Sequence, residues 1–318
     1  MAISFVTRML QAGMAGGQAG KRLSEQDLGP LEAQCPLCHS EQPRGSVITL
    51  QEVPAVELLE CANCAAISAS RMPTEKALID YYCDYYSHFA SGFTFDGDVR
   101  FAQRLIGTGK IPVTKRSAVS VLDFGGGVEA GLARAVAQIL LEERRTEKVK
   151  LTLVDYNARG QKASAQTEVV AYRTLYELPH HQTFDVIIAS AIMEHVPDLG
   201  RDLLILLNSL ALGGVAYFRT PSNSKMIRFL KNFGITLDFT YPAHLHDLGE
   251  PFWARVLPAL HLTDSHRLIH SKPAIVETDF LRTPVRSAAA WTMKAPWYIL
   301  GSKWAMVGGW EAIIQRLS

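Results

Sequence analysis

The sequence lacks an excess of charge of either sign: 32 Lys and Arg residues stand against 31 Asp and Glu residues, and the formal net charge is +1. Proteins that follow the phosphates of a nucleic acid or an anionic membrane over a long surface carry a clear positive excess. The chain also has no run near the roughly 18 apolar residues of a transmembrane helix. We therefore expect a soluble, cytoplasmic protein without a membrane span, whose partner is a small molecule and not a nucleic acid.

Cysteine is scarce as well, because only five occur in 318 residues and four of them form two CxxC pairs. A secreted domain held together by disulfides has a denser set of cysteines. The pair Cys35 and Cys38 is separated by 22 residues from the pair Cys61 and Cys64. This spacing predicts a tetrahedral zinc site of four thiolates, closed to other ligands and therefore structural. No role is assigned to Cys83.

The residues around the cysteine pairs predict a small β ribbon followed by a helix. Apolar and polar residues alternate at 46–50 and 56–60, which is typical of strands. A short helix is predicted at 75–82, and it leads into a cluster of tyrosines. This cluster either joins the ribbon to the rest of the chain or contributes to a lid over a cofactor, with three candidate lid residues: Tyr85, Tyr86 and His88.

The stretch 119–127, VSVLDFGGG, is an apolar run that meets one acid and then three glycines. It predicts a buried parallel strand, a tight turn and a helix whose first N–H groups can meet a ligand. Gly125, Gly127 and Ala130 also satisfy the dinucleotide fingerprint. However, Asp123 would face the pyrophosphate of NAD, whereas it would attract the sulfonium and ammonium of S-adenosylmethionine. The other interpretation is a glycine turn that only packs a strand on a helix.

Strands and helices are predicted to alternate after residue 117, which indicates βαβ units and a parallel sheet covered by helices on both faces. Ligands of such folds bind outside the carboxyl ends of the strands. Asp155 follows the second strand, where an acid can accept from two ribose hydroxyls. The predicted strands are 119–124, 149–155, 168–172, 184–190 and 214–219, and the predicted helices are 128–141, 158–165, 201–210 and 223–233.

The motifs LDFGGG, LVDYN, FDVIIASAIMEHVPD and LALGGVAYFRTPSN follow one another at the expected separations. The chain from about 97 to 282 resembles the class I S-adenosylmethionine-dependent methyltransferases. The resemblance implies a Rossmann-like α/β fold with a mostly parallel seven-stranded sheet. It also implies that Asp155 holds the ribose. The implied contacts of the methionine end are Asp123, Gly125 and Gly127, and the implied borders of the methyl-transfer site are Ala189 and Ser190. Thr174 stands where an aspartate often contacts the adenine.

The segment LECANCAAISASRMPTEKALIDYYCDYY resembles the zinc-ribbon segment that precedes methyltransferase domains in sugar and surface-glycan modification. In sugar C-methyltransferases of this kind a Glu-His pair removes a proton, and Glu194 and His195 align with that pair. Ile192 stands where those enzymes have a tyrosine. Metal-dependent O- and RNA-end methyltransferases share the pair but add an acid three residues earlier, at a position that is Ala191 here. A metal site at this place would therefore lack a ligand.

Two further histidines, His244 and His246, resemble the loop that closes over the acceptor in these enzymes. His195 is the first candidate for a general base, supported by Glu194, and His244 is the second. We expect S-adenosylmethionine as cofactor, zinc as a structural metal, and methyl transfer to a sugar or related metabolite. The alternatives are an RNA-modifying methyltransferase with a zinc module and a non-catalytic zinc-ribbon binding protein.

The chain is predicted to divide into an N-terminal tail at 1–28, a zinc ribbon and tyrosine-rich linker at 29–95, a methyltransferase domain at 96–285 and a helical tail at 286–318. The acid-free N-terminal segment is expected to be a weakly docked helix, with a transit peptide as the alternative. Residues 262–281 predict a closing β hairpin. In the tail, the spacing of apolar residues predicts a helix that packs on the domain or on a second subunit of a homodimer: Trp297, Leu300, Trp304 and Val307.

Overall fold

The structure of the protein is a computed structural model. It describes residues 21–88, 98–107, 116–127, 130–143, 145–156, 164–235, 237, 239–275, 284–304 and 306–317. The N-terminal segment 1–20 and most of the predicted helix at 158–165 lie outside these residues, as do the side chains of the tyrosine-rich lid candidates and of Cys83. Within the described ranges, no helix combines the length and the apolar character that crossing a membrane requires.

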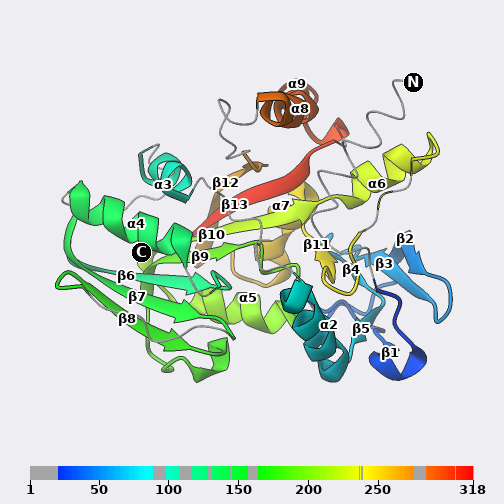
Figure 1. The fold of residues 1–318 in the computed structure, drawn as a ribbon, viewed down its shortest axis with the longest axis horizontal. Helices are drawn as coiled ribbons and strands as arrows, with labels where there is room; N and C mark the ends of the chain where they lie inside the picture. The colour runs from blue at the N-terminus through cyan, green and yellow to red at the C-terminus, as the bar shows by residue number, and fades with distance from the viewer. Residues whose placement is uncertain are drawn as a thin grey trace.

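A seven-stranded sheet forms the centre of the fold (Figure 1). Its strand order is β12-β13-β10-β9-β6-β7-β8, and β13 runs antiparallel to both of its neighbours while the other adjacent pairs are parallel. The mostly parallel sheet expected from the sequence is therefore confirmed. The strands are β6 (Arg116–Phe124), β7 (Thr146–Val154), β8 (Thr167–Tyr172), β9 (Phe184–Ser190), β10 (Leu210–Ser222), β12 (His266–Pro273) and β13 (Gly308–Arg316).

Helices cover both faces of the sheet because the central strands are apolar on both sides. On one face, α3 (Asp98–Gly107) and α4 (Gly131–Glu142) pack with strand residues such as Val121 in one buried cluster. On the other face, α5 (Leu199–Asn208) and α7 (Glu250–Ala259) pack in a second cluster. Figure 1 shows α3 and α4 on one side of the sheet and α5 on the other.

One strand of the predicted closing hairpin at 262–281 is present as β12, and residues 276–281 lie outside the described residues. Strand β12 pairs with β13 at the end of the chain, with Pro273 opposite Trp310. The predicted helical tail is wrong beyond residue 300. The described helices there are α8 (Pro284–Lys294) and the short α9 (Trp297–Leu300), after which Gly301 has a positive φ of 58°.

A physical reason for this difference lies in the sequence of β13, GGWEAIIQR. Ile313 and Ile314 are both fully buried, one on each face of the sheet. Burial of both faces is typical of a strand that lies between two other strands. The spacing of Trp297 and Trp304 suggested one helix face, but tertiary burial of the following β-branched pair determines the structure.

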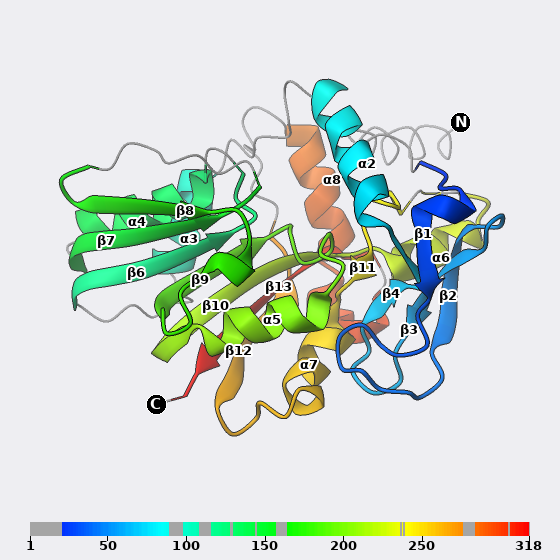
Figure 2. The same cartoon turned by 90° about the horizontal axis from the view of Figure 1, so that it is seen from below.

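The ribbon strands predicted at 46–50 and 56–60 are confirmed as β2 (Gly45–Gln51) and β3 (Val56–Glu60). They continue into β4 (Ile67–Ala69), and the fourth strand of this sheet, β11 (His246–Asp247), comes from the second half of the chain. A separate antiparallel pair joins β1 (Leu28–Leu31) to β5 (Arg71–Pro73). In Figures 1 and 2 these ribbon strands gather at one end of the large sheet, away from β6, β7 and β8.

The ribbon shares its core with the large sheet. Cys35, Leu37 and Cys61 belong to the same buried cluster as α5. A Cβ added to Gly200 of α5 would lie 2.4 Å from the carbonyl oxygen of Leu37, so only glycine allows this close approach. The remaining helical elements are α2 (Glu75–His88), α6 (Ser224–Lys231) and three short 3₁₀ turns: Glu25–Asp27, Leu175–Glu177 and Gly301–Lys303.

Candidate active site

The turn after β6 is built around the buried carboxylate of Asp123, which is 4% exposed. A Cβ on Gly126 would lie 1.8 Å from Oδ2 of Asp123, so the carboxylate fills the space beside that glycine. A Cβ on Gly125 would collide with the side chain of Ile192 at 2.4 Å. Only Gly127, with a φ of 68°, has open space where a Cβ would be. A ligand can therefore approach the backbone of the turn at Gly127, but not at Gly125 or Gly126.

Asp155 lies immediately beyond β7, the strand next to β6, and is half-buried. Its Oδ2 accepts a hydrogen bond from the N–H of Gly127 at 3.0 Å. The N–H of Gly125 donates to the carbonyl of Val154 at 2.9 Å, which holds the turn against the end of β7. Two acidic side chains are thus fixed at neighbouring strand ends, with Gly127 between them.

These residues fit S-adenosylmethionine. A Cβ on Gly127 would meet nothing within 4 Å, so a ligand can approach the backbone there, next to the carboxylate of Asp155. A cofactor with a sulfonium and an ammonium is attracted by negative charge. A dinucleotide would instead bring a pyrophosphate to the same acids.

The end of β9 lies at the same edge of the sheet. Ser190 is half-buried and pairs in register with Arg219 of β10. Ala189 is fully buried and belongs to the core, so its side chain does not reach the edge. After β9, Ala191 adopts a positive φ of 56°, and its N–H donates to the carbonyl of Arg219. The chain then turns so that Ile192 packs on Gly125, which links the glycine turn to the residues that follow.

Those next residues include Glu194, whose side chain is buried. Oε1 lies 3.8 Å from Nε2 of His195, and no described hydrogen-bond donor reaches Oε2. Burial raises the pKa of Glu194 to about 8, because a carboxylate removed from water is costly. Burial thus favours the protonated form of Glu194, and the role of Glu194 in supporting His195 stays a prediction.

His195 is held in one orientation by backbone. Its Nδ1 lies 2.7 Å from the carbonyl oxygen of Ala243, so Nδ1–H donates to this oxygen and the neutral ring carries its lone pair on Nε2. The hydroxyl of Tyr82 lies 3.2 Å from Nδ1. Burial lowers the pKa of His195 from its usual value. The imidazole is thus a neutral base at physiological pH, and 23% of its side chain is exposed.

His244 joins this group from a distant part of the chain. Its ring centroid lies 4.9 Å from that of His195, and its Nδ1 lies 2.8 Å from the hydroxyl oxygen of Thr240. Burial, together with the neighbouring His195, lowers the pKa of His244 to about 3. His246 differs, because it is fully buried with both ring nitrogens bonded, to the hydroxyl of Ser68 and the carbonyl of Val196. It joins the ribbon to the site and does not face an acceptor.

Among the residues that the structure describes, two groups of side chains have the geometry of metal ligands. The four thiols of Cys35, Cys38, Cys61 and Cys64 lie within 4.8 Å of one another, with two Sγ–Sγ distances of 3.6 and 3.7 Å. A zinc–sulfur bond of about 2.3 Å corresponds to sulfur separations of about 3.8 Å in a tetrahedron, so the thiols fit zinc.

The second group, Glu194, His195 and His244, is equally compact. Ala191 supplies no ligand, as the sequence indicated, but the fold brings His244 to the other two residues instead.

The mostly parallel seven-stranded sheet with helices on both faces is a Rossmann-like fold. A family model described as "Methyltransferase domain" matches residues 86–267, more than half of the chain. The chain therefore belongs to this methyltransferase family and is an S-adenosylmethionine-dependent methyltransferase. No curated protein matches the chain.

Several solved structures are similar in general outline. The N-methyltransferase NodS from Bradyrhizobium japonicum WM9, in complex with S-adenosyl-L-homocysteine, is 12% identical with a TM-score of 0.37, and the match covers 68% of this chain and 88% of that one. The plantazolicin methyltransferase BpumL is 12% identical with a TM-score of 0.44, and the match covers 77% of this chain and 92% of that one. An S-adenosylmethionine-dependent methyltransferase from Mesorhizobium loti is 13% identical with a TM-score of 0.40, and the match covers 70% of this chain and 100% of that one. The family assignment depends on the family model and not on these likenesses.

Two parts of the site were absent from the sequence prediction. Tyr82 belongs to a cluster of tyrosines, and the sequence does not indicate which tyrosine of the cluster contacts His195. The carbonyl of Ala243, which fixes the tautomer of His195, is a backbone atom that side-chain patterns do not reveal.

Proposed function

We propose that the protein transfers a methyl group to a hydroxyl of a small polyhydroxylated metabolite, such as a sugar or a glycan precursor. The observation that carries the proposal is His195, a neutral imidazole with a fixed tautomer and a partly exposed ring. It lies three residues from Ile192, which packs on the glycine turn. A base at this place can serve an acceptor that meets the cofactor turn.

In this proposal Asp123, Gly127 and Asp155 hold the cofactor, with Gly125 shaping the turn and Ser190, next to the core residue Ala189, bordering the acceptor. When bound, S-adenosylmethionine supplies an activated methyl group. Nε2 of His195 takes the proton of the acceptor hydroxyl, and Nδ1–H remains on the carbonyl of Ala243. A positioned base typically contributes about 10²–10⁴-fold to the rate.

Glu194 lies beside the base and acts on it electrostatically. At 3.8 Å its Oε1 is too far from Nε2 for a hydrogen bond, so Glu194 takes no part in the transfer of the acceptor's proton. His244 remains neutral beside His195 and is the second candidate for the base.

A methyl-transfer assay with labelled S-adenosylmethionine tests the proposal on a panel of sugars, sugar phosphates, phenols and RNA. His195→Ala should lower kcat by about 10²-fold or more, while binding of S-adenosylhomocysteine stays unchanged. His180→Ala, which removes an exposed histidine, is the matched control. Because the neutral form of His195 is the active one and its pKa is lowered, the rate should rise with pH, with a midpoint below the usual histidine pKa of about 6.5.

A loss of less than about threefold in His195→Ala, far below the contribution expected of a base, would show that this histidine is structural. Transfer to RNA alone would exclude a small-molecule acceptor.

A further inference from the structure

The side chains of Glu194, His195 and His244 meet at metal-ligand distance although they come from two distant segments. One ligand atom of each lies within 4.8 Å of the others, and Oε1 of Glu194 is 3.8 Å from Nε2 of His195. A tetrahedral zinc ion with bonds of about 2.1 Å holds its ligand atoms about 3.4 Å apart. Modest side-chain rotations would therefore bring all three groups onto one ion. Two imidazoles and a carboxylate suit first-row divalent metals such as zinc.

The two histidines present the same ring nitrogen. Nδ1–H of His195 donates to the carbonyl of Ala243 at 2.7 Å. The hydroxyl of Thr240 donates to the carbonyl of Phe239, so its oxygen accepts from Nδ1–H of His244, 2.8 Å away. Each ring then has its lone pair on Nε2. Histidines that bind a metal through one nitrogen are oriented in this way, with the other N–H donated to an oxygen.

Glu194 brings a carboxylate that the described residues leave without a donor at one oxygen. The residue is 3% exposed, and no described donor reaches Oε2. A buried carboxylate is costly unless it is paired or coordinates a metal ion. A cation bound beside the two histidines would therefore offset the cost of burying Glu194.

The group is partly accessible to solvent on the side of His195, whose side chain is 23% exposed. His244 is half-buried. Three protein ligands leave at least one position on a bound ion for water or another oxygen. His246 cannot join them, because its two ring nitrogens are already bonded to the hydroxyl of Ser68 and the carbonyl of Val196.

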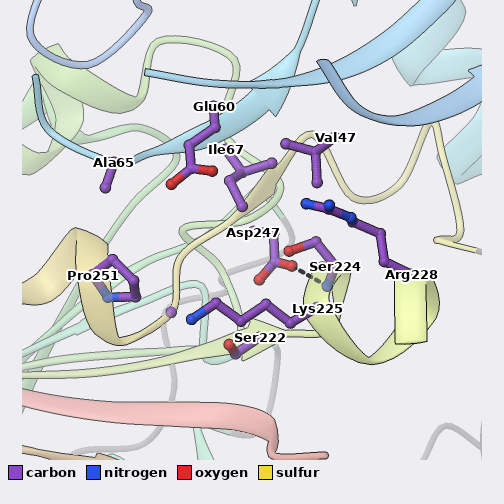
Figure 3. Close-up of a pocket in the computed structure, with 11 residues that line it drawn as sticks. Val47, Glu60, Ala65, Ile67, Ser222, Ser224, Lys225, Arg228, Asp247 and Pro251 are labelled. Carbon is purple, nitrogen blue, oxygen red and sulfur yellow. Dashed lines mark hydrogen bonds between the residues drawn. The ribbon is translucent and has the colours of Figure 1, made fainter. Parts of the chain in front are cut away.

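The backbone holds the segment of His244 in place on both sides. The N–H groups of the two residues after His244 donate to the carbonyl of Glu194, and β11 pairs with β4 of the ribbon. Asp247, at the end of β11, accepts from the N–H of Ser224 at the start of α6, as Figure 3 shows. Ligands that are already fixed lose less freedom when an ion binds, which favours affinity.

We propose that Glu194, His195 and His244 form a second metal site, separate from the four thiols, which binds a first-row divalent cation such as zinc. The site has three protein ligands instead of four, so it should bind more weakly than the thiols, and protein purified without added metal should keep only the thiol-bound zinc.

This inference goes beyond the proposed function, and only one consequence of it rests on that function. A metal on Nε2 of His195 uses the lone pair with which the histidine would take the proton of the acceptor. Filling the site should therefore inhibit methyl transfer, at saturation by about as much as His195→Ala, about 10²-fold or more.

The test adds Co²⁺ to protein that holds one zinc and follows the visible absorption, with calorimetry of Zn²⁺ in parallel. We expect one additional ion per chain. Its spectrum should lack the charge-transfer absorption that thiolate ligands give to cobalt, which distinguishes the new site from exchange at the cysteines. Mg²⁺ prefers oxygen ligands and should not compete.

Two substitutions remove one ligand each: Glu194→Gln and His244→Ala should both weaken binding at least about tenfold. Thr240→Val removes the oxygen that orients His244 and should weaken binding about tenfold to a hundredfold. The matched control, His180→Ala with His181→Ala, removes two exposed histidines that could bind metal adventitiously, and it should bind like the parent. Unchanged binding of S-adenosylhomocysteine shows that each variant is folded.

The inference is overturned if the parent takes up no second ion, if the two ligand variants bind it as tightly as the parent, or if only the control loses it. The two proposals can fail separately. Inhibition of methyl transfer as the ion binds, reversed by a chelator that leaves the thiol-bound zinc, supports both. A second ion that does not inhibit would keep the metal site and remove His195 as the base, whereas a rate that depends on His195 in protein that takes up no second ion would do the reverse.

Discussion

Replacing Glu194 by Gln should change how the stability of the protein depends on pH. Glu194 is buried without a donor on Oε2, and burial raises its pKa in the folded state from 4.5 to about 8. A group whose pKa is higher in the folded than in the unfolded state stabilises the fold at low pH. That stabilisation is complete below pH 4.5 and is lost as the pH rises toward 8.

The size of the effect follows from the two pKa values. Each unit of difference corresponds to about 1.4 kcal/mol, so the free energy of unfolding should fall by about 4 kcal/mol between pH 5 and pH 9 through this group. Gln has nearly the same shape as the protonated side chain and does not ionise. Glu194→Gln should therefore match the parent at pH 5 within about 1 kcal/mol and be more stable at pH 9 by about 4 kcal/mol.

Urea unfolding of the zinc-loaded parent and variant at pH 5, 7 and 9 measures this difference directly. Proton uptake by the cysteine thiols is common to both proteins and cancels. Glu168→Gln removes an exposed carboxylate of β8 and should leave the pH dependence of the parent unchanged. A stability difference between Glu194→Gln and the parent that is the same at all three pH values would refute the reasoning.

Three further substitutions test the ribbon and the turn. Metal analysis of the purified protein should find about one zinc per chain, and Cys61→Ser should lose it and unfold at a lower temperature; a variant that keeps its zinc would contradict the Cys₄ site. Gly126→Ala places a methyl group 1.8 Å from the carboxylate of Asp123, so calorimetry should show at least about tenfold weaker binding of S-adenosylhomocysteine, with zinc content unchanged. Gly200→Ala meets the carbonyl of Leu37 and should lower the free energy of unfolding by about 1–3 kcal/mol; an unchanged denaturation curve would mean that the ribbon does not pack closely on α5.

The sequence predicted those parts of the fold whose signal is local. The stretch ending at Asp123 combines a continuous apolar run with glycines, and β6 with its turn lies where it was expected. The spacing of Cys35 and Cys38 from the second pair likewise predicted that four thiols would meet.

The remainder depends on contacts between distant segments. Strand β11 has only two residues, and it exists because Asp247 and its neighbour complete the edge of the ribbon sheet. The approach of His244 to His195 follows from that docking. The N–H groups of Leu245 and His246 donate to the carbonyl of Glu194, and the carbonyl of Ala243 accepts from His195. No periodicity in the sequence records such contacts, and the buried position of Glu194 that raises its pKa is visible only in the fold.

Calorimetric titration of S-adenosylhomocysteine into the parent and into Asp155→Ala tests most directly whether the glycine turn and Asp155 hold the cofactor. We expect micromolar binding to the parent and about tenfold to a hundredfold weaker binding to Asp155→Ala, because a charge-assisted contact to the ribose is lost. Asp155→Asn keeps an acceptor for the N–H of Gly127 and should fall between the two. Equal affinity of Asp155→Ala and the parent, or displacement of S-adenosylhomocysteine by NAD, would contradict this expectation.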